Sequence, residues 1–182
     1  MRVIAGKAKG RTLRSVPGPG TRPITNRAKA ALFSILSPEL PSCRFLDLFA
    51  GTGQVGIEAL SRGAERAVFV ERGQAALRTI RANLTLTQLQ AGAEVVPADV
   101  FRYLARPPEA FDYVYVAPPQ YRGLWVQTLR QLDLHLAWLV DDGWAIVQIH
   151  PKEYKPQTLE HLELFDQRQY GSVMLCFYQR RL

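Results

Sequence analysis

The stretch Asp47-Leu48-Phe49-Ala50-Gly51-Thr52-Gly53-Gln54-Val55-Gly56 carries the strongest structural signal in the chain. An apolar run over 44–49 leads into it and a helical pattern near 54–62 follows, so the glycines form a turn between a strand and a helix. Glycine lets the backbone approach a ligand closely, and the start of a helix offers free N–H groups. This pattern indicates a cofactor site in a parallel α/β sheet.

Outward from this stretch, short β-branched or aromatic runs alternate with helical patterns, which predicts βαβ units around a mostly parallel sheet. Strands are expected over 44–49, 66–71, 94–97, 112–116, 144–149, 161–169 and 172–179, and helices near 54–62, 77–84, 100–105 and 123–138. The last two strands meet at Tyr170-Gly171 as an antiparallel hairpin, and Asp142-Gly143 is expected to form a turn. The predicted fold class is α/β and Rossmann-like, with a seven-stranded sheet.

The N-terminal part is expected to form a small extension on this core. Residues 2–5 and 11–16 have the pattern of two short strands joined by a glycine-containing turn. Thr25 is a suitable N-cap for a helix over 26–36, whose apolar positions leave Arg27 and Lys29 off the buried stripe. We interpret residues 1–182 as one domain, with an extension over 1–40 and a core over 41–182.

Positive charge is concentrated in the extension. The chain has 23 cations and 16 acids, and its first 30 residues contain eight cations and no acid. Those eight are Arg2, Lys7, Lys9, Arg11, Arg14, Arg22, Arg27 and Lys29. A segment of one charge sign attracts polyanions, so a nucleic-acid backbone is the partner that this charge predicts. A solubilising tail is the alternative, although Val3, Leu13 and Val16 are apolar residues that a solvated tail would lack.

Composition argues against several classes of protein. A hydrophobic share of 47% and a charged share of 21% over 182 residues suit a globular domain with its own core. The apolar runs are far shorter than the roughly 20 residues that span a bilayer, and the N-terminus lacks the apolar core of a secretory signal. Cys43 and Cys176 lack metal-ligand spacing, as do His135, His150 and His161, so no metal is expected. We expect a cytoplasmic monomer with both cysteines buried.

Three carboxylates near the ends of successive strands help to distinguish between the cofactors that such a glycine turn can bind. Glu71 stands 20 residues after Gly51 and Asp99 follows the third strand, where carboxylates can bind ribose hydroxyls and an adenine amino group. Asp47 lies four residues before Gly51, where it would repel a pyrophosphate but attract a cationic aminoacyl-sulfonium group. The set favours S-adenosylmethionine, and a nicotinamide-dependent oxidoreductase remains the alternative.

A wider resemblance covers essentially the whole chain. The segment over 47–53, Glu71, Asp99 and the Pro-Pro after the fourth strand resemble class I amino-methyltransferases. More specific segments are Arg2-Val3-Ile4-Ala5-Gly6-Lys7-Ala8-Lys9-Gly10-Arg11, Arg22-Pro23-Ile24-Thr25-Asn26-Arg27 with Ala31-Leu32-Phe33, Gly56-Ile57-Glu58-Ala59-Leu60-Ser61-Arg62-Gly63-Ala64, and Tyr121-Arg122-Gly123-Leu124. These segments resemble the bacterial 16S ribosomal RNA guanine-N2 methyltransferase family.

The resemblance implies methylation of the exocyclic amine of a guanine in 16S ribosomal RNA, with S-adenosylmethionine as donor and the RNA or an assembling small subunit as partner. It implies a donor site formed by Asp47, Phe49, Gly51, Thr52, Gly53, Glu71, Asp99 and Val100. The residues that would frame the target amine are Ala117, Pro118, Pro119, Gln120 and Tyr121. RNA contacts are expected from Arg2, Lys7, Lys9, Arg11, Arg22, Arg27 and Arg122.

The segment after the fourth strand departs from the family's pattern. Families of this kind use Asp or Asn, then Pro-Pro and an aromatic residue, to hold the amine and stack on a flipped base. Here Ala117 has no side-chain acceptor and Tyr121 comes one position late, although the amide oxygen of Gln120 could substitute. Three interpretations stay open: an active enzyme that positions the amine with backbone carbonyls and a neighbour, an enzyme of altered substrate choice, and an inactive RNA-binding protein. A protein-glutamine or DNA-adenine methyltransferase is a further alternative, which the basic extension disfavours.

Overall fold

The computed structural model describes residues 1–19 and 23–182. Its centre is a seven-stranded sheet with the order β3-β2-β1-β4-β5-β7-β6. The parallel strands are β1 (Arg44–Leu48), β2 (Arg66–Glu71), β3 (Ala93–Pro97), β4 (Phe111–Val116) and β5 (Leu139–Ile149). The antiparallel strands are β6 (Leu162–Tyr170) and β7 (Val173–Arg180), of which β7 pairs with β5. This arrangement confirms the predicted fold class, including the C-terminal hairpin.

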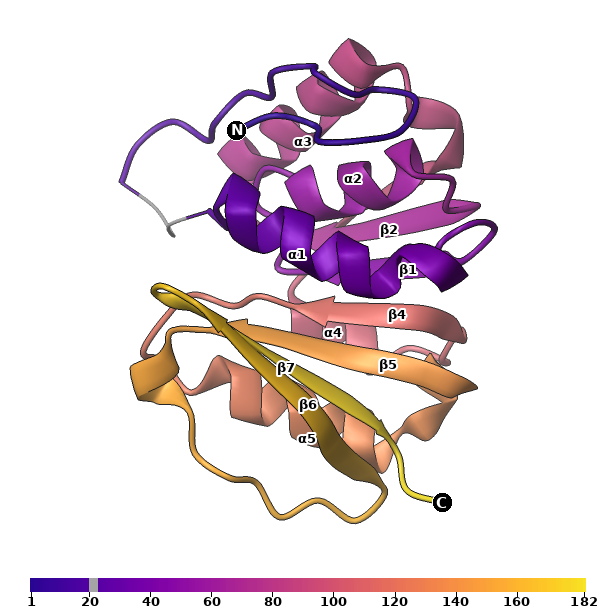
Figure 1. The fold of residues 1–182 in the computed structure, drawn as a ribbon, viewed down its shortest axis with the longest axis vertical. Coiled ribbons are helices and arrows are strands. Elements are labelled where there is room, and N and C mark those ends of the chain that lie inside the picture. Colours follow the sequence, from indigo (N-terminus) through magenta and orange to yellow (C-terminus); the bar gives the residue numbers. More distant parts are fainter. Residues whose placement is uncertain (20–22) are drawn as a thin grey trace.

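Helices cover both faces of the sheet (Figure 1). One face carries α1 (Asn26–Leu36), α2 (Gln54–Ser61) and α3 (Gln74–Thr87), and the other carries α4 (Val100–Leu104) and α5 (Leu124–Leu134). Successive strand residues point to opposite faces, so the sheet separates two layers of core. Phe45 and Phe69 pack in the first layer, whereas Leu46 and Val68 pack in the second.

α1 begins where the sequence predicts, and its buried face differs from the prediction at one position. The hydroxyl of Thr25 accepts a hydrogen bond from the N–H of Ala28 at 3.1 Å, which caps the helix. Leu32 and Leu36 are fully buried, as the periodicity predicts. Lys29 was expected off the buried stripe, and this was wrong, because its side chain is 0% exposed. Polar groups of three residues, Arg2 in the extension and Gln54 and Glu58 on α2, surround its ammonium and replace water there.

The two strands predicted in the N-terminal extension reduce to a single antiparallel bridge between Arg2 and Thr12. The regular ladder is interrupted because the N–H groups of Ile4 and Ala5 donate to the carboxylate of Glu58 on α2 instead of to the opposite segment. The extension is therefore shaped by the helix beneath it, and the prediction of two strands was wrong.

The extension nevertheless packs onto the core. Figure 1 shows its first residues crossing over α2 and α3. Val3, Ala8 and Leu13 are buried, and the side-chain oxygen of Asn83 on α3 accepts a hydrogen bond from the N–H of Arg14 at 2.8 Å. Buried apolar side chains and long-range hydrogen bonds exclude a solvated tail for residues 1–14.

Two boundaries in the C-terminal half differ from the prediction. β5 starts at Leu139 and continues through Asp142-Gly143, where a turn was expected. Gly143 suits this strand because a Cβ atom there would lie about 3 Å from three backbone carbonyl oxygens. The helix expected over 123–138 ends at Leu134, and a short 3-10 turn follows.

Cys43 and Cys176 are free and buried, as predicted. Burial raises the pKa of the Cys43 thiol to about 12 and that of Cys176 to about 11, which leaves both as unreactive thiols at neutral pH. No helix in the described part of the chain has both the length and the apolar character needed to cross a membrane.

Candidate active site

A cavity of about 720 Å³ opens at the carboxyl ends of the central parallel strands. Sheets of this class bind ligands there, because the loops after neighbouring strands meet at one edge. The lining includes most of the residues that the sequence singles out, namely Asp47, Phe49, Gly51, Thr52, Glu71, Asp99, Val100, Ala117, Pro118, Pro119, Gln120 and Arg122. Of the residues predicted to bind the donor or to frame the target amine, Gly53 and Tyr121 lie outside that lining. Segments far apart in the sequence thus form one cleft.

A second hollow, of about 560 Å³, lies near the amino ends of β1, β2 and β3. Three of its four charged lining residues are already paired, since Arg66 forms ion pairs with Glu94 and with Glu109 outside the lining, and Arg44 also pairs with Glu109. Those pairs leave little unsatisfied charge for a ligand. The cavity at the carboxyl ends is therefore the candidate site.

Asp47 is the most buried carboxylate of this cavity, with 2% of its surface exposed. Its Oδ2 accepts a hydrogen bond from the N–H of Gly56 at 3.1 Å. Burial raises the pKa of Asp47 to about 8, the hydrogen bond from Gly56 opposes that rise, and the nearby charge of Glu71 adds to it. A cation in the cavity would favour the ionised form, so the site is suited to a positively charged ligand.

The glycines of the turn have separate structural roles. Gly51 has φ +59°, and a Cβ atom there would have no neighbour within 4 Å, so its backbone is open to the cavity. Gly53 has φ +79° and turns the chain into α2. A Cβ atom on Gly56 would lie 2.4 Å from the ring of Phe69, so this glycine allows α2 to pack closely on the sheet. Only the first of the three has the position expected of a ligand contact.

Backbone N–H groups hold the other two carboxylates at the cavity wall. Glu71 accepts hydrogen bonds from the N–H of Gly51 at 2.9 Å and from that of Gly73 at 2.8 Å. Asp99 caps α4, because its Oδ1 accepts from the N–H of Phe101 at 2.9 Å. Glu71 is thus fixed by its own loop and by the turn after β1, and Asp99 by the start of α4, so the positions of both are set before any ligand arrives.

Two further polar residues of the cavity, Tyr115 and Gln148, were not predicted from the sequence. Tyr115 on β4 is the register partner of Asp47 on β1, and its hydroxyl donates to the side-chain oxygen of Gln148. Burial, with the neighbouring charge of Asp47, raises the pKa of Tyr115 well above its usual value, so the phenol keeps its proton. The available signal was a glutamine inside the apolar run Ala145-Ile146-Val147-Gln148-Ile149.

Tyr121 and Arg122 lie at the mouth of the cavity. The ring of Tyr121 is 64% exposed and its centre is 5.9 Å from that of His150. The backbone N–H of Tyr121 donates to Glu153 at 2.6 Å, which holds the residue outside the lining. Arg122 is exposed and contributes to the lining.

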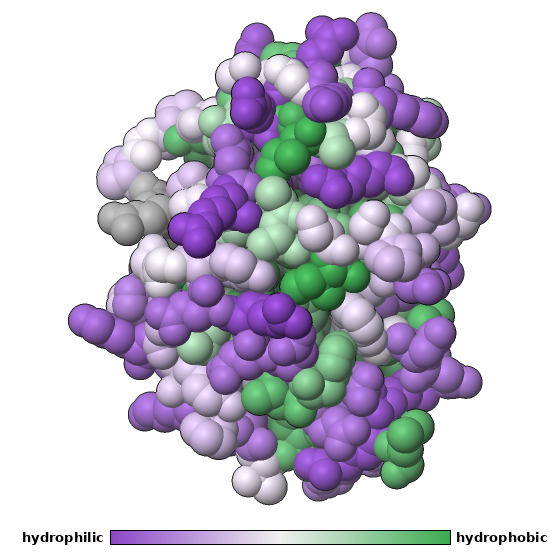
Figure 2. Space-filling view, in the orientation of Figure 1, coloured by the Kyte–Doolittle hydropathy of each residue, from purple (hydrophilic) through white to green (hydrophobic). Residues whose placement is uncertain are grey.

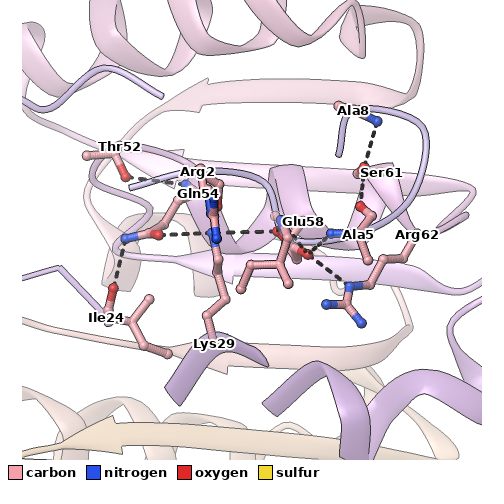
Figure 3. Close-up of polar contacts among 12 residues, drawn as sticks. Arg2, Ala5, Ala8, Ile24, Lys29, Thr52, Gln54, Glu58, Ser61 and Arg62 are labelled. Atoms are coloured by element: carbon pink, nitrogen blue, oxygen red, sulfur yellow. Dashed lines mark hydrogen bonds and ion pairs between the residues drawn. The ribbon is translucent and has the colours of Figure 1, made fainter. Parts of the chain in front are cut away.

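The N-terminal extension forms part of the cavity wall through Met1, the segment 15–19 and Pro23-Ile24. A buried polar cluster joins it to the core (Figure 3). The ammonium of Lys29 donates to the carbonyl of Arg2 at 2.7 Å and to the side-chain oxygen of Gln54 at 3.2 Å, and lies 3.5 Å from Glu58. Gln54 itself lines the cavity. The extension and the candidate site are thus one connected structure.

Glu58 is the centre of this cluster. Its carboxylate accepts hydrogen bonds from two N–H groups of the extension and from Nε of Arg62 at 2.9 Å, in addition to the ion pair with Lys29. Its side chain is 0% exposed. Ser61, one helical turn later, accepts from the N–H of Ala8 at 2.9 Å and donates to the carbonyl of Ala5 at 2.7 Å. α2 therefore binds the extension along one face.

Six of the seven cations expected to contact RNA lie in the described part of the chain, and all six are on the surface. The exposed ones are Arg2, Lys7, Lys9, Arg11, Arg27 and Arg122. Within residues 1–19 and 23–182, none of these six forms an ion pair. Figure 2 shows hydrophilic side chains over much of the surface that the extension and its neighbouring helices occupy. Arg22 lies outside the described residues.

Comparison with known proteins agrees with this geometry. Residues 1–179 match the protein-family model described as Conserved hypothetical protein 95. YlbH of Bacillus subtilis (strain 168) is 36% identical over 185 residues, which is 100% of both chains. The Escherichia coli (strain K12) protein named Ribosomal RNA small subunit methyltransferase D is 34% identical over 99% of this chain and 90% of that protein. The solved structure of yhhF from Escherichia coli has a TM-score of 0.87 and 32% identity, covering 99% of this chain and 97% of that one.

Proposed function

The chain belongs to the Conserved hypothetical protein 95 family, whose relatives include Ribosomal RNA small subunit methyltransferase D, and from this membership we propose that it methylates ribosomal RNA of the small subunit. The donor is S-adenosylmethionine and the acceptor is the exocyclic N2 amine of a guanine. The single observation that carries this proposal is the cavity in which Asp47, Glu71 and Asp99 meet the end of β4. A basic surface lies beside the same cavity, as a nucleic-acid substrate requires.

The residues of the cavity fit S-adenosylmethionine. A volume of about 720 Å³ is within the usual range for small-molecule sites, and Gly51 leaves its backbone open to a ligand. Asp47 would face the cationic group, Glu71 would accept from the ribose hydroxyls, and Asp99 would accept from the adenine amine. When bound, the donor supplies a methyl group on a sulfonium, which is a good leaving group. A pyrophosphate would meet the buried Asp47 carboxylate, so the nicotinamide alternative is disfavoured.

The protein's task in this reaction is mainly one of position. An amine nitrogen must be aligned with the methyl carbon for in-line displacement, and alignment of this kind can remove several kcal/mol of the barrier. The segment from Ala117 to Pro119 lies in the lining at the end of β4, where its backbone carbonyls can hold the hydrogens of an amine. The extension forms one side of the cavity and would limit, without abolishing, the access of water to the reacting atoms.

Donor affinity is expected to rise with pH between about 6 and 7.5. Burial raises the pKa of Asp47 to about 8 in the free protein, so the carboxyl is protonated in this range. A cationic donor favours the carboxylate, and binding therefore releases a proton, with at most a tenfold gain in affinity per pH unit. Calorimetry at about pH 6.5, in buffers of different ionisation enthalpy, measures the release. The release should vanish in Asp47→Asn, and affinity independent of pH in the wild type would contradict the assignment.

The basic extension is expected to provide a salt-dependent part of RNA binding. The logarithm of the RNA association constant falls linearly with log[salt], and each phosphate contact adds about one to the steepness of that fall. The triple variant Lys7→Ala, Lys9→Ala, Arg11→Ala should therefore make the slope less steep by about 2 to 3. Filter binding of 16S RNA over a salt series measures the slope. A matched control removes three cations from other surfaces of the molecule, as Arg106→Ala, Arg130→Ala and Lys155→Ala. Equal slopes for the two triple variants would remove the extension from the RNA interface.

A direct assay tests the function as a whole. Small ribosomal subunits from an Escherichia coli strain that lacks its Ribosomal RNA small subunit methyltransferase D are incubated with labelled S-adenosylmethionine and this protein. We expect label in RNA and N2-methylguanine in the nucleoside digest by mass spectrometry. The second candidate is an RNA-binding protein without activity, which Ala117 favours because it removes an acceptor side chain. Tight subunit binding without transfer of label would select that candidate.

A further inference from the structure

The end of β4 lacks a side-chain hydrogen-bond acceptor, and the neighbouring strand presents one beside it. β4 and β5 are parallel and their last paired residues are Val116 and Val147. The next residue on each strand is Ala117 and Gln148, so these two positions lie side by side. Paired residues of parallel strands point to the same face of a sheet. Gln148 therefore extends from the same face as Ala117, and both residues line the cavity.

Gln148 is held in place, as a residue that positions a substrate must be. The hydroxyl of Tyr115 donates to its side-chain oxygen, and Tyr115 is itself 2% exposed. An amide oxygen has two acceptor sites, so one remains for a second donor. Gln120, the substitute that the sequence suggests, is exposed, and no hydrogen bond to its side chain is present in the described part of the chain. Gln148 is thus the ordered amide of the two.

We propose that the side-chain oxygen of Gln148 accepts a hydrogen bond from the target amine and replaces the acceptor that Ala117 lacks. Tyr115 acts through Gln148 as a positioning residue. This inference rests on the proposed function and deepens it, because it names a residue that contacts the substrate. It also explains how an alanine can stand after β4 in an active enzyme.

The hydrogen bond helps the reaction by holding the amine without taking its proton. The nitrogen forms a bond to the methyl carbon, the carbon–sulfur bond breaks, and sulfur keeps that electron pair. The nitrogen then carries one proton too many, which passes to solvent water. An amide oxygen is too weak a base to take this proton, so the role of Gln148 is to orient the nitrogen lone pair toward the methyl group.

The test compares Gln148→Leu with the double variant Gln148→Leu, Ala117→Asn. Single-turnover methyl transfer to the small subunits described above is measured at saturating donor, and donor affinity is measured separately by calorimetry. We expect Gln148→Leu to transfer about tenfold to thirtyfold more slowly, because the amine hydrogen in the cavity is left without its acceptor, with donor affinity within about threefold of wild type. Asn at position 117 supplies a new acceptor and should restore most of the rate. Gln127→Leu, at an exposed position of α5, is the control for adding leucine.

The outcomes separate this inference from the proposed function. If wild type transfers label and Gln148→Leu transfers it at the same rate, the role of Gln148 is overturned and the proposed function stands. A slow Gln148→Leu whose rate Ala117→Asn does not restore also overturns the role, because the loss is then structural. Absence of transfer by wild type overturns the proposed function and this inference with it. A slow single variant and a restored double variant support both.

Discussion

Asp47→Asn is expected to weaken binding of S-adenosylmethionine by about 100-fold at pH 7.5. A hydrogen bond or close contact to a charged group contributes about 1.5 to 3 kcal/mol, and the upper value corresponds to about two orders of magnitude in Kd. The side chain of Asp47 is 2% exposed, so little water is present to screen its attraction for a cation. Isothermal titration calorimetry of the two proteins measures the ratio of dissociation constants.

Asparagine is the matched replacement because it changes the charge and keeps the shape. Its side-chain oxygen can still accept from the N–H of Gly56, as Asp47 does at 3.1 Å. The free protein should not lose stability at pH 7.5. Burial raises the pKa of folded Asp47 to about 8, above its usual value, so ionisation of this group opposes folding as pH rises from about 4 to about 8. A folded Asp47→Asn protein that binds the donor within about threefold of wild type would remove Asp47 from the donor site.

Glu58→Ala is expected to lower the free energy of unfolding by about 3 to 5 kcal/mol, which is the usual result of removing one member of a buried ion pair. The substitution leaves the ammonium of Lys29 without its carboxylate and two N–H groups of the extension without an acceptor. For a chain of this length the loss corresponds to a fall in Tm on the order of 10 °C. Differential scanning calorimetry and urea titration measure the two quantities.

Two further variants test the cause of that loss. Glu65→Ala removes an exposed carboxylate just before β2 and should change stability by less than about 0.5 kcal/mol. The double variant Lys29→Met, Glu58→Gln removes both charges and should be more stable than Glu58→Ala, because no uncompensated charge is buried. If Glu58→Ala proved as stable as Glu65→Ala, the buried cluster would contribute nothing to the attachment of the extension.

The buried cluster also shows that a run of cations in the sequence does not reveal which of them are exposed and which are buried. Eight cations among the first 30 residues predict a surface for a polyanion, and most of them are exposed as that prediction requires. Lys29 belongs to the same run and is fully buried. Its burial depends on Glu58, which lies 29 residues later in the sequence. The residues Gln54, Glu58 and Ser61 recur at helical spacing, and this was the one local sign that α2 has a polar face with a partner.

Some residues of the candidate site can likewise be predicted from local sequence, and others only from the tertiary structure. The glycine turn, Glu71 and Asp99 follow from local patterns at strand ends, and the parallel topology places those ends at one edge. Gln148 has only the local sign of a glutamine within an apolar run, and no local pattern relates it to Tyr115. They are brought together only because β1, β4 and β5 are neighbours in the sheet, in the register that pairs Asp47 with Tyr115.

The sequence by itself determined the α/β class, the order of most elements, the glycine turn after β1 and the concentration of positive charge, because each depends on residues close together in the chain. The tertiary structure alone decided which polar groups are buried and which side chains share the cavity. The attachment of the extension to α2 and the placement of Gln148 beside Ala117 belong to this second group. Burial and strand register depend on contacts between distant segments, and local periodicity carries no information about the partner that a side chain will meet.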